Sequence, residues 1–525
     1  MKKKHMIITA AVLLVVIAGG ITAYSLLSRG TQDTEEEDFL PEGWEIDIGK
    51  LRDTTLTFYI NAMSQSEYKD VLEELNLKLD NDIRCKIAFE FYYENYQAFI
   101  NRIKRDNASG QTCDAFFYSP DSNMSVKSIA DEGLAMDVSG LFPEYASGYY
   151  NQFTNEEIKA MSVSGGIYLI PPRIPSTSVR YALVRQDLME KYRIPEIHSY
   201  DDLEAYLERI RLNEPDMLPL RLEDTTMGLF ADVYGYVILD YVSGLVYKWD
   251  DPSMKVMAWE QVPEYKEILE RIRRWNDNDY LGTDGRIDYV LVDENPEAAF
   301  SAPFITDGKT ASFISDPSDQ MYFNTLLSSK GIRDFTYKAY PLYDGYSARY
   351  SIPNKGIMIN SRSRQPERVL MFIDWLQSYQ ENYDLLMYGA KGTHYVDKGD
   401  YIEPPAGTAT TFLVWGWKMP FENIDNQRAN YPGQSSEMAE YREILDKKTK
   451  YPPHFGFRPD FSTMKRLYED RYMSLLTQEH EIFNDHDFDD TMYEEFLEEQ
   501  KSHGIDILIG EVQGQLDGYM AGNAR

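Results

Sequence analysis

The chain is poor in cysteine, in histidine and in positive charge. Its two cysteines, Cys85 and Cys113, lack the spacing of a metal site, and each lies at the start of an apolar run. One disulfide could form in an oxidising compartment, but we favour two small buried residues. The 86 acidic residues outnumber the 53 basic ones and give a net charge of −33. Such a charge repels phosphate backbones and anionic lipids, so nucleic acid is not an expected partner.

Signatures of common catalytic and nucleotide-binding sites are also missing. The sequence contains no G-x-x-x-x-G-K-[ST] phosphate loop, no H-E-x-x-H and no G-x-S-x-G motif, and its seven histidines are scattered singly. The acidic run that starts at Asp485 resembles a calcium loop only superficially, because Asp490 takes the glycine position and Phe496 the glutamate position. Carboxylates are too abundant for a glycosidase acid–base pair to be singled out. We therefore expect no catalytic residue, no cofactor and no metal site.

What the sequence does have begins at the N-terminus. Lysines at 2–4 precede residues 6–27, which carry no charge and are long enough to span a bilayer, since about 20 apolar residues suffice. Positive residues on the N-terminal side keep residues 1–5 in the cytoplasm. A cleaved signal peptide is the alternative, but Ile21 is a poor residue close to the expected cleavage position. We favour a single-pass membrane anchor and an acidic linker at 28–50. The body then lies on the extracytoplasmic side of the cell membrane, or is secreted if the segment is cleaved.

Strands and helices alternate at the start of the body. The run LTFYI at 56–60 predicts a buried strand, and apolar residues at helical spacing predict a helix over 67–80. A strand at 86–93, a helix at 98–105 and a third strand at 113–119 follow. This β-α-β-α-β order is typical of a parallel sheet covered by helices.

The alternation breaks near residue 170 and then resumes. Further strands or extended segments are expected at 179–184, 311–315 and 352–361. Further helices are expected at 200–213, 229–241, 262–275 and 366–387. No internal repeat of fixed period is present.

The break itself, YLIPPRIPSTSV at 168–179, joins two apolar strands without a glycine turn. Its three prolines stiffen the chain and are unfavourable inside a central strand. Together with 352–361 it would provide two extended connectors between two α/β lobes, and the lobes could bend about them. An ordinary loop within one large sheet is the alternative, and the sequence leaves both open.

Several stretches resemble the family 1 extracellular solute-binding proteins of ABC importers. GGIYLIP, followed by VRYALVRQDLMEKYRIPEIHSYDDLEAYLERI, is similar to a strand, the interlobe crossing and two helix starts of that family. ASGQTCDAFFYSPD and FITDGKTASFISDP resemble two of its strands, with Cys113 where proline is usual and Ser312 where methionine is usual. MYGAKGTHYV and the tail GIDILIGEVQGQLDGYM resemble the lipoprotein LipO-like subgroup. The matches extend from Leu56 to Met520, and their order and number carry the assignment.

The resemblance implies an α/β fold with two lobes, the type II periplasmic-binding-protein clamshell, with the ligand held between the lobes. The usual ligands are sugars or oligosaccharides, delivered to ABC permease subunits in the membrane. The subgroup is normally lipid-anchored through a cysteine that follows its signal peptide. This chain has no cysteine before Cys85, so an uncleaved helix would retain the protein at the membrane instead of a lipid. We expect a monomer with lobe 1 at 51–172, completed by 350–414, lobe 2 at 173–349, and a helical C-terminal region at 415–525.

Sugar recognition needs flat apolar faces and planar polar groups that bridge neighbouring hydroxyls, and ligands of open α/β sheets lie beyond the carboxyl ends of strands. The candidate ligand-binding residues that follow from these rules are Asn61, Ser64, Gln65, Tyr118, Asp121, Arg173, Asp316, Trp415 and Trp417. Asp121 and Asp316 lie where the resemblance places ligand-contacting loops, but each adjoins a proline, so a turn is the alternative role. Trp415 and Trp417 are two apart and would point to opposite faces of an extended chain, with core packing as their alternative.

These features predict a membrane-tethered, extracytoplasmic binding protein that closes on a carbohydrate and offers it to an importer. A ligand sensor that reports to a membrane kinase is one alternative, which the predicted anchor favours. An anchored glycan-cleaving enzyme is another, and product release from oligosaccharides would identify it.

Overall fold

A computed structural model of the protein describes residues 48–63, 68–119, 125–174, 177–222, 225–281, 303–349, 355–406, 416–461, 463–484 and 489–523. The predicted anchor at 6–27 lies outside these ranges, as does the predicted linker apart from a short 3-10 helix, η1 (Ile48–Lys50). Within the described ranges, no helix combines the length and the apolar character needed to cross a membrane.

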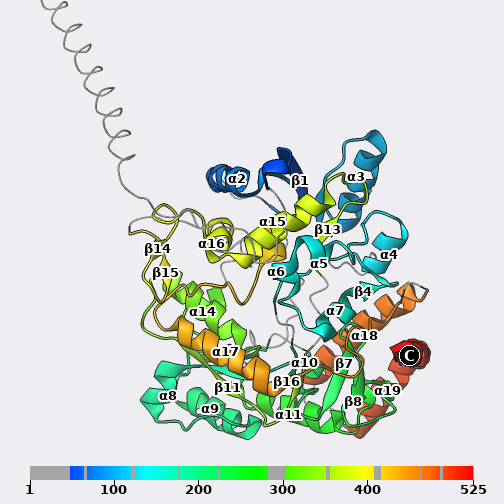
Figure 1. Cartoon of the computed structure of the whole chain (residues 1–525). Coiled ribbons are helices and arrows are strands. Elements are labelled where there is room, and N and C mark those ends of the chain that lie inside the picture. The colour runs from blue at the N-terminus through cyan, green and yellow to red at the C-terminus, as the bar shows by residue number, and fades with distance from the viewer. Residues whose placement is uncertain are drawn as a thin grey trace, which may run out of the picture. The chain divides into compact units, whose positions relative to one another are not determined.

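The first sheet is built as the sequence predicts, by strands that alternate with helices (Figure 1). In chain order its elements are β1 (Thr54–Ile60), α2 (Tyr68–Ile83), β2 (Cys85–Phe91), α3 (Tyr96–Ser109), β3 (Ala115–Tyr118) and β13 (Gly356–Ile359). The spatial order is β13-β3-β1-β2, in which β13 is antiparallel to β3 and the other pairs are parallel. The helix α2 buries Val71, Leu75 and Leu79, which share one face because they are four residues apart.

A second sheet has β6 (Tyr181–Arg185) at its centre, flanked by β10 (Ser312–Ser315) and β11 (Tyr337–Pro341), both antiparallel to β6. Its neighbouring helices are α8 (Gln186–Tyr192), α9 (Tyr200–Asn213), α11 (Tyr265–Asp277), α13 (Pro303–Thr306) and α14 (Ser318–Ser329). None of these strands pairs with the first sheet, so the alternative of one large sheet is wrong.

The helix predicted at 229–241 is wrong. Helix α10 (Thr226–Phe230) is short, and a three-stranded antiparallel sheet follows, made of β7 (Tyr236–Asp240), β8 (Leu245–Lys248) and β9 (Met257–Ala258). Gly235 has a φ of +72°, which glycine adopts readily, and this turn separates α10 from β7. The β7–β8 turn is fixed by Asp240, whose carboxylate accepts hydrogen bonds from the backbone and hydroxyl of Ser243.

The helix predicted at 366–387 is two helices, α15 (Pro366–Ser378) and α16 (Gln380–Tyr388). They are separated by Tyr379, which is extended, with φ −125° and ψ 123°. Both helices bury nearly all of their residues, so the apolar pattern continues across the break and hides it.

The C-terminal region is helical, as predicted. It contains η3 (Gly416–Phe421), α17 (Gln434–Lys448), α18 (Lys465–Asn484), α19 (Asp490–Ser502) and α20 (Ile505–Asn523). Figure 1 shows α18 and α19, in orange to red, beside the green elements around α11 and β8. Leu475 of α18 and Phe496 of α19 belong to the same buried cluster as Trp259 and Trp275, so these helices complete the core around the second sheet.

The remaining elements are short. They are α4 (Val126–Asp131), α5 (Phe142–Tyr145), α6 (Ser147–Tyr150), α7 (Asn155–Met161), β4 (Ser162–Val163), β5 (Gly166–Ile167), η2 (Trp259–Gln261), β12 (Ser347–Ala348), β14 (Val396–Asp397), β15 (Ile402–Glu403) and β16 (Thr449–Lys450).

Three segments that are far apart in the sequence are joined by backbone hydrogen bonds. Ile170 and Ile357 exchange two backbone hydrogen bonds of 2.9 Å, and further along Thr177 bridges Arg349. On its other side the first segment pairs with a third one, since Arg173 N donates to Glu422 O and Ile424 N donates to Arg173 O, both at 2.9 Å. The described parts of the two predicted extended stretches are therefore hydrogen-bonded to each other, and residues 356–359 of the second form β13 of the first sheet. Their role as connectors between two lobes stays a prediction.

Gly356 lies where two of these segments approach most closely. A Cβ atom at this position would lie 2.2 Å from Ile170 O and 2.9 Å from Pro171 Cα. We expect Gly356→Ala to lower the free energy of unfolding by about 1–3 kcal/mol, because both neighbours are backbone and must move apart. Urea unfolding measures this loss. Gly140→Ala is the control, because a Cβ atom there has no neighbour within 4 Å. Equal losses in the two variants would contradict the close approach.

Candidate functional site

The carboxyl ends of β1 and β3 lie next to each other in the first sheet. Tyr59 pairs with Phe116, and continuing this parallel register places Asn61 beside Tyr118. The side chain of Asn61 accepts a hydrogen bond of 3.1 Å from the backbone of Glu94. Tyr118 is 2% exposed and packs edge-on against Tyr96, with the ring centroids 5.7 Å apart. These two predicted residues are therefore brought together at the edge where ligands of α/β sheets are found.

Lys355 reaches the same edge from the second extended segment. It directly precedes Gly356, which is paired with Tyr118. Burial lowers the pKa of Lys355, and the interaction with Glu422 opposes that shift. Glu422 lies on the third extended segment, and burial raises the pKa of its carboxyl group. Within the described residues, no salt bridge joins these two half-buried groups, so their charges are only partly compensated.

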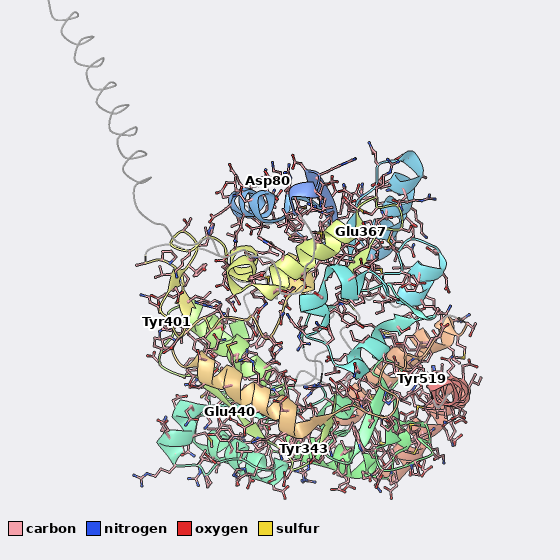
Figure 2. All side chains as sticks on the ribbon, viewed as in Figure 1. Asp80, Tyr343, Glu367, Tyr401, Glu440 and Tyr519 are labelled. Carbon is pink, nitrogen blue, oxygen red and sulfur yellow. The ribbon has the colours of Figure 1, made fainter. Side chains whose placement is uncertain are left out.

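Arg458 lies in the segment between α17 and α18. That segment is held in place by Gly456, where a Cβ atom would lie 2.9 Å from the Cα atom of Ala160, and by Tyr519, whose hydroxyl donates to Phe455 O at 2.7 Å (Figure 2 labels Tyr519). Burial lowers the pKa of Arg458, and the nearby Tyr118 opposes that shift. Among the residues that the structure describes, none forms a hydrogen bond or ion pair with the Arg458 guanidinium.

A second polar group lies on the side of the second sheet. The carboxylate of Asp232, which follows α10, accepts a hydrogen bond of 3.2 Å from Tyr343, whose hydroxyl also contacts Ser347 (Figure 2 labels Tyr343). Burial raises the pKa of Asp232 to about 6, although Ser178 on the first extended segment, Ser347 and Arg180 favour the charged form. This carboxyl group can therefore donate or accept a hydrogen bond near neutral pH.

Arg349 and Tyr451 connect the extended segments to the C-terminal region. Arg349 Nη1 donates to the hydroxyl of Tyr451 at 3.1 Å, and its Cζ atom lies 5.2 Å from the centroid of the tyrosine ring. The same hydroxyl is 3.4 Å from Thr154 Oγ1, at the start of α7. Tyr451 therefore contacts both the start of α7 and the residue that follows β12.

Arg173, one of the predicted binding residues, instead contacts neighbouring segments of the protein. Its Nη2 lies 3.1 Å and its Nε 3.2 Å from Asp425 Oδ2. Nη1 donates to Gln152 O and is 3.9 Å from Glu157. Because these contacts occupy much of the guanidinium, few of its donors remain for a ligand.

Asp316 lies at the carboxyl end of β10, as predicted. One carboxylate oxygen accepts from the backbone of Ser318 at 2.8 Å, which is the turn role considered as its alternative. The other accepts from the hydroxyl of Thr177 on the first extended segment at 2.9 Å. Asp316 therefore takes part in a turn and also contacts the crossing at Thr177.

The other predicted residues cannot be placed in the same way. Ser64, Gln65, Asp121 and Trp415 lie outside the described residues, and so does the side chain of Trp417. Their proposed role in binding stays a prediction.

Sequence reasoning missed Lys355, Glu422, Arg458 and Asp232. A signal was present for Lys355, a charged residue inside a predicted extended connector, and for Arg458, which lies in the proline-rich aromatic run YPPHFGFRPDF. Asp232 was missed because a helix was expected at 229–241 and the turn that contains Asp232 was not.

Both cysteines are buried and free, as favoured from the sequence. Burial raises the pKa of the Cys85 thiol to about 11 and that of Cys113 to about 12, so both are unreactive at neutral pH. In the described part of the chain, no three His, Cys, Asp or Glu side chains are grouped so that they could hold a metal ion.

The family model for bacterial extracellular solute-binding proteins matches residues 69–383. The chain belongs to this family. The family consists of binding proteins rather than enzymes, and its location is extracytoplasmic. Assignment of this solute-binding protein to the LipO-like subgroup stays a prediction.

Solved structures show the same type II periplasmic-binding-protein fold. The N-glycan transport solute-binding protein NgtS from Streptococcus pneumoniae has a TM-score of 0.68 and 16% identity, over 89% of this chain and 99% of that chain. An HMO-binding solute-binding protein associated with an ABC transporter, from Bifidobacterium longum infantis, has a TM-score of 0.60 and 14% identity, over 89% of this chain and 99% of that chain. FusA from S. pneumoniae, solved with kestose, has a TM-score of 0.57 and 14% identity, over 89% and 100%. No curated protein sequence matches this solute-binding protein.

Proposed function

We propose that this solute-binding protein binds a sugar or oligosaccharide between its two lobes and delivers it to the permease of an ABC importer. The observation that carries the proposal is the presence of two separate sheets together with three paired segments that are far apart in the sequence, with polar side chains beside them. Three similar structures support the ligand class: the N-glycan transport protein NgtS in complex with Man1GlcNAc, the HMO-binding protein and FusA in complex with kestose.

The proposed lobes are those expected from the sequence, with lobe 1 at 51–172 completed by 350–414 and lobe 2 at 173–349. A ligand that contacts both lobes only in the closed arrangement shifts the population towards closure, and its differential affinity supplies the driving force. Asn61, Tyr118 and Asp316 are proposed to contact it. So are Ser64, Gln65, Asp121, Arg173, Trp415 and Trp417.

We also propose that residues 6–27 retain the protein at the membrane, with the body on the extracytoplasmic side. The linker at 28–50 is acidic, and its charge repels that of anionic lipids. A tether of this kind keeps the binding protein close to its permease and so raises the local concentration for delivery.

A panel of neutral and acidic mono- and oligosaccharides tests the proposal. The full chain is purified in detergent and its thermal unfolding is followed with each sugar. A true ligand at a hundredfold excess over its Kd stabilises the folded state by about 2.7 kcal/mol. Calorimetric titration of each positive sugar then gives the Kd. No shift with any sugar, in a protein that unfolds cooperatively, would contradict the carbohydrate assignment.

A further inference from the structure

The segment 449–457, which we call the strap, is attached to β12 and β8. Its first two residues form β16, which pairs with β12, and the backbone N of Arg349, directly after β12, donates to Lys450 O at 2.7 Å. Nδ1 of His454 lies 2.9 Å from the hydroxyl of Tyr247 in β8, and this histidine is 6% exposed. Backbone pairing and a buried hydrogen bond therefore hold the strap on these two strands.

Both strands belong to the core around the second sheet. Val246 of β8 lies in the same buried cluster as Ala182 and Val184 of β6. Tyr247 of β8 and Ala348 of β12 share another buried cluster. The strap is thus connected to the second sheet through residues that pack against each other.

The strap also contacts α7, from the cap of this helix to its last turn. The hydroxyl of Tyr451 is 3.4 Å from Oγ1 of Thr154, the residue that caps the start of α7. Gly456 approaches Ala160 so closely that a Cβ atom on the glycine would lie 2.9 Å from both Cα and Cβ of the alanine. The first contact is long for a hydrogen bond, and the second is a van der Waals approach. The strap is therefore held less strongly on α7 than on β12 and β8.

Helix α7 is attached to the first sheet. It leads directly into β4, which pairs with β5. Val138 N donates to Ile167 O of β5 at 2.8 Å, and Met136 N donates to Ile359 O of β13 at the same distance. In terms of the proposed lobes, α7 lies in lobe 1, whereas β8 and β12 lie in lobe 2. The strap therefore contacts elements of both.

The sequence of the strap favours a rigid element. Pro452 and Pro453 fix two φ angles. Two short turns follow, in which Phe455 N donates to Pro452 O at 2.9 Å and Phe457 N donates to His454 O at 2.7 Å. A stiff segment with two attachment points resists a change in the distance between them.

We propose that the strap acts as a latch between the two lobes: it stays on lobe 2, contacts α7 reversibly, and stabilises the arrangement of the lobes seen in the structure. The inference rests on the two lobes of the proposed function and adds a control of their movement. Contacts that exist in only one arrangement shift the population towards that arrangement. The strap therefore contributes to the free energy of closure, and so to the affinity for the ligand, without contacting the ligand.

Distances between spin labels on the two lobes test this role without any ligand. The labels are attached at Leu77→Cys in α2 and Leu212→Cys in α9, because these side chains are 63% and 69% exposed. The natural cysteines, Cys85 and Cys113, are buried and do not compete for the label. Double electron–electron resonance on the full chain in detergent gives the distribution of the distance between the labels. We expect one main distance when the strap is unchanged.

Gly456→Ala should raise the population of a second distance at least about fivefold relative to the main one. The added methyl group would collide with the backbone of Ala160 and force the strap away from α7. Gly433→Ala is the matched control. The two glycines have a similar φ, +90° at Gly456 and +94° at Gly433, but a Cβ atom on Gly433 has no neighbour within 4 Å. The control therefore carries the same backbone strain without the collision, and it should leave the distribution unchanged.

Tyr451→Phe is a second and milder variant. It removes the hydroxyl that reaches Thr154 and keeps the ring, so we expect the second population to rise about twofold. Tyr234→Phe is its control, because the hydroxyl lost there contacts Glu267 within lobe 2. Thermal unfolding shows whether each variant is folded, and Tyr451→Phe decides the question if Gly456→Ala is not.

The outcomes separate this role of the strap from the proposed function. Equal distance distributions in Gly456→Ala and Gly433→Ala would overturn it and leave the carbohydrate function standing. If Gly456→Ala does not fold, equal distributions in Tyr451→Phe and Tyr234→Phe would overturn it in the same way. A second distance that appears only in the strap variants, in a protein that binds no sugar of the panel, would support the role of the strap and contradict the carbohydrate function.

Discussion

Arg471→Met is expected to lower the free energy of unfolding by about 3–5 kcal/mol. Arg471 lies in α18 and its side chain is fully buried, as is that of Glu260 in η2. Its Nη2 lies 2.6 Å from Glu260 Oε2, and its Nη1 donates to Gln500 of α19. Methionine has a similar length but no charge, so Glu260 would become a buried carboxylate without a partner. Urea unfolding at pH 7 measures the loss.

Two further variants identify the cause of this loss. Arg471→Met combined with Glu260→Leu should recover most of it, because a buried ion pair can be replaced by apolar residues at little cost once both charges are gone. Arg466→Met is the exposed control in the same helix, since its side chain is 95% exposed, and it should change stability by less than about 1 kcal/mol. A loss in Arg471→Met no larger than in this control would show that the buried pair does not hold α18 in place.

The stability of the protein is expected to fall as the pH rises from about 4.5 to about 7, and Glu479→Gln should remove much of that fall. Glu479 in α18 is 1% exposed, and burial raises the pKa of its carboxyl group from 4.5 to about 7. Thr226 and Tyr265 donate hydrogen bonds to its Oε1 at 2.5 Å and 2.8 Å. Glutamine keeps an acceptor for both donors and cannot ionise.

The direction of this pH dependence follows from the pKa of the Glu479 carboxyl group, which is 4.5 in the unfolded state and about 7 in the folded state. Below pH 4.5 the carboxyl group is protonated in both states and contributes nothing to the pH dependence. Between pH 4.5 and 7 the unfolded state loses the proton and the folded state keeps it. Stability therefore declines with pH until the folded state also ionises. The total decline is on the order of 3 kcal/mol.

Parallel measurements on the natural protein and Glu479→Gln isolate this contribution. The free energy of unfolding is determined by urea at pH 5 and pH 8.5 for both proteins. Other titrating groups, among them Asp232, are common to both and cancel in the difference. Between pH 5 and pH 8.5, the free energy of unfolding of the variant should rise relative to that of the natural protein by about 2–3 kcal/mol. An unchanged difference between the two pH values would mean that Glu479 is already ionised in the folded state.

Local pattern accounts for much of the first sheet. The runs at 56–60 and 113–119 became β1 and β3, and the helix expected at 200–213 became α9 with the same bounds. In these three elements, the spacing of apolar residues in the sequence agrees with the observed element boundaries. The helix expected at 229–241 failed because Tyr236 and its neighbours are apolar on both faces of a hairpin, and a short buried run of this kind fits either structure.

The candidate site was predicted in part. The rule that ligands lie beyond the carboxyl ends of strands placed Asn61, Tyr118 and Asp316 on described edges of the two sheets. Arg173 was found on the crossing, but its ion pair with Asp425 was invisible, because the two residues are far apart in the chain. The same is true of the burial of Lys355 and of Arg458, which depends on the pairing of β13 with β3 and on the position of the C-terminal segment.

By itself the sequence determined the order of strands and helices in the first sheet, the stiff crossings and the family, because these depend on spacing, on proline geometry and on motifs within single stretches. Only the tertiary structure decided which crossings pair with each other, which charges are neutralised and which helices complete the second core. Those properties depend on contacts between distant segments, where burial changes the energy of a charge by several kcal/mol, and no local pattern records them.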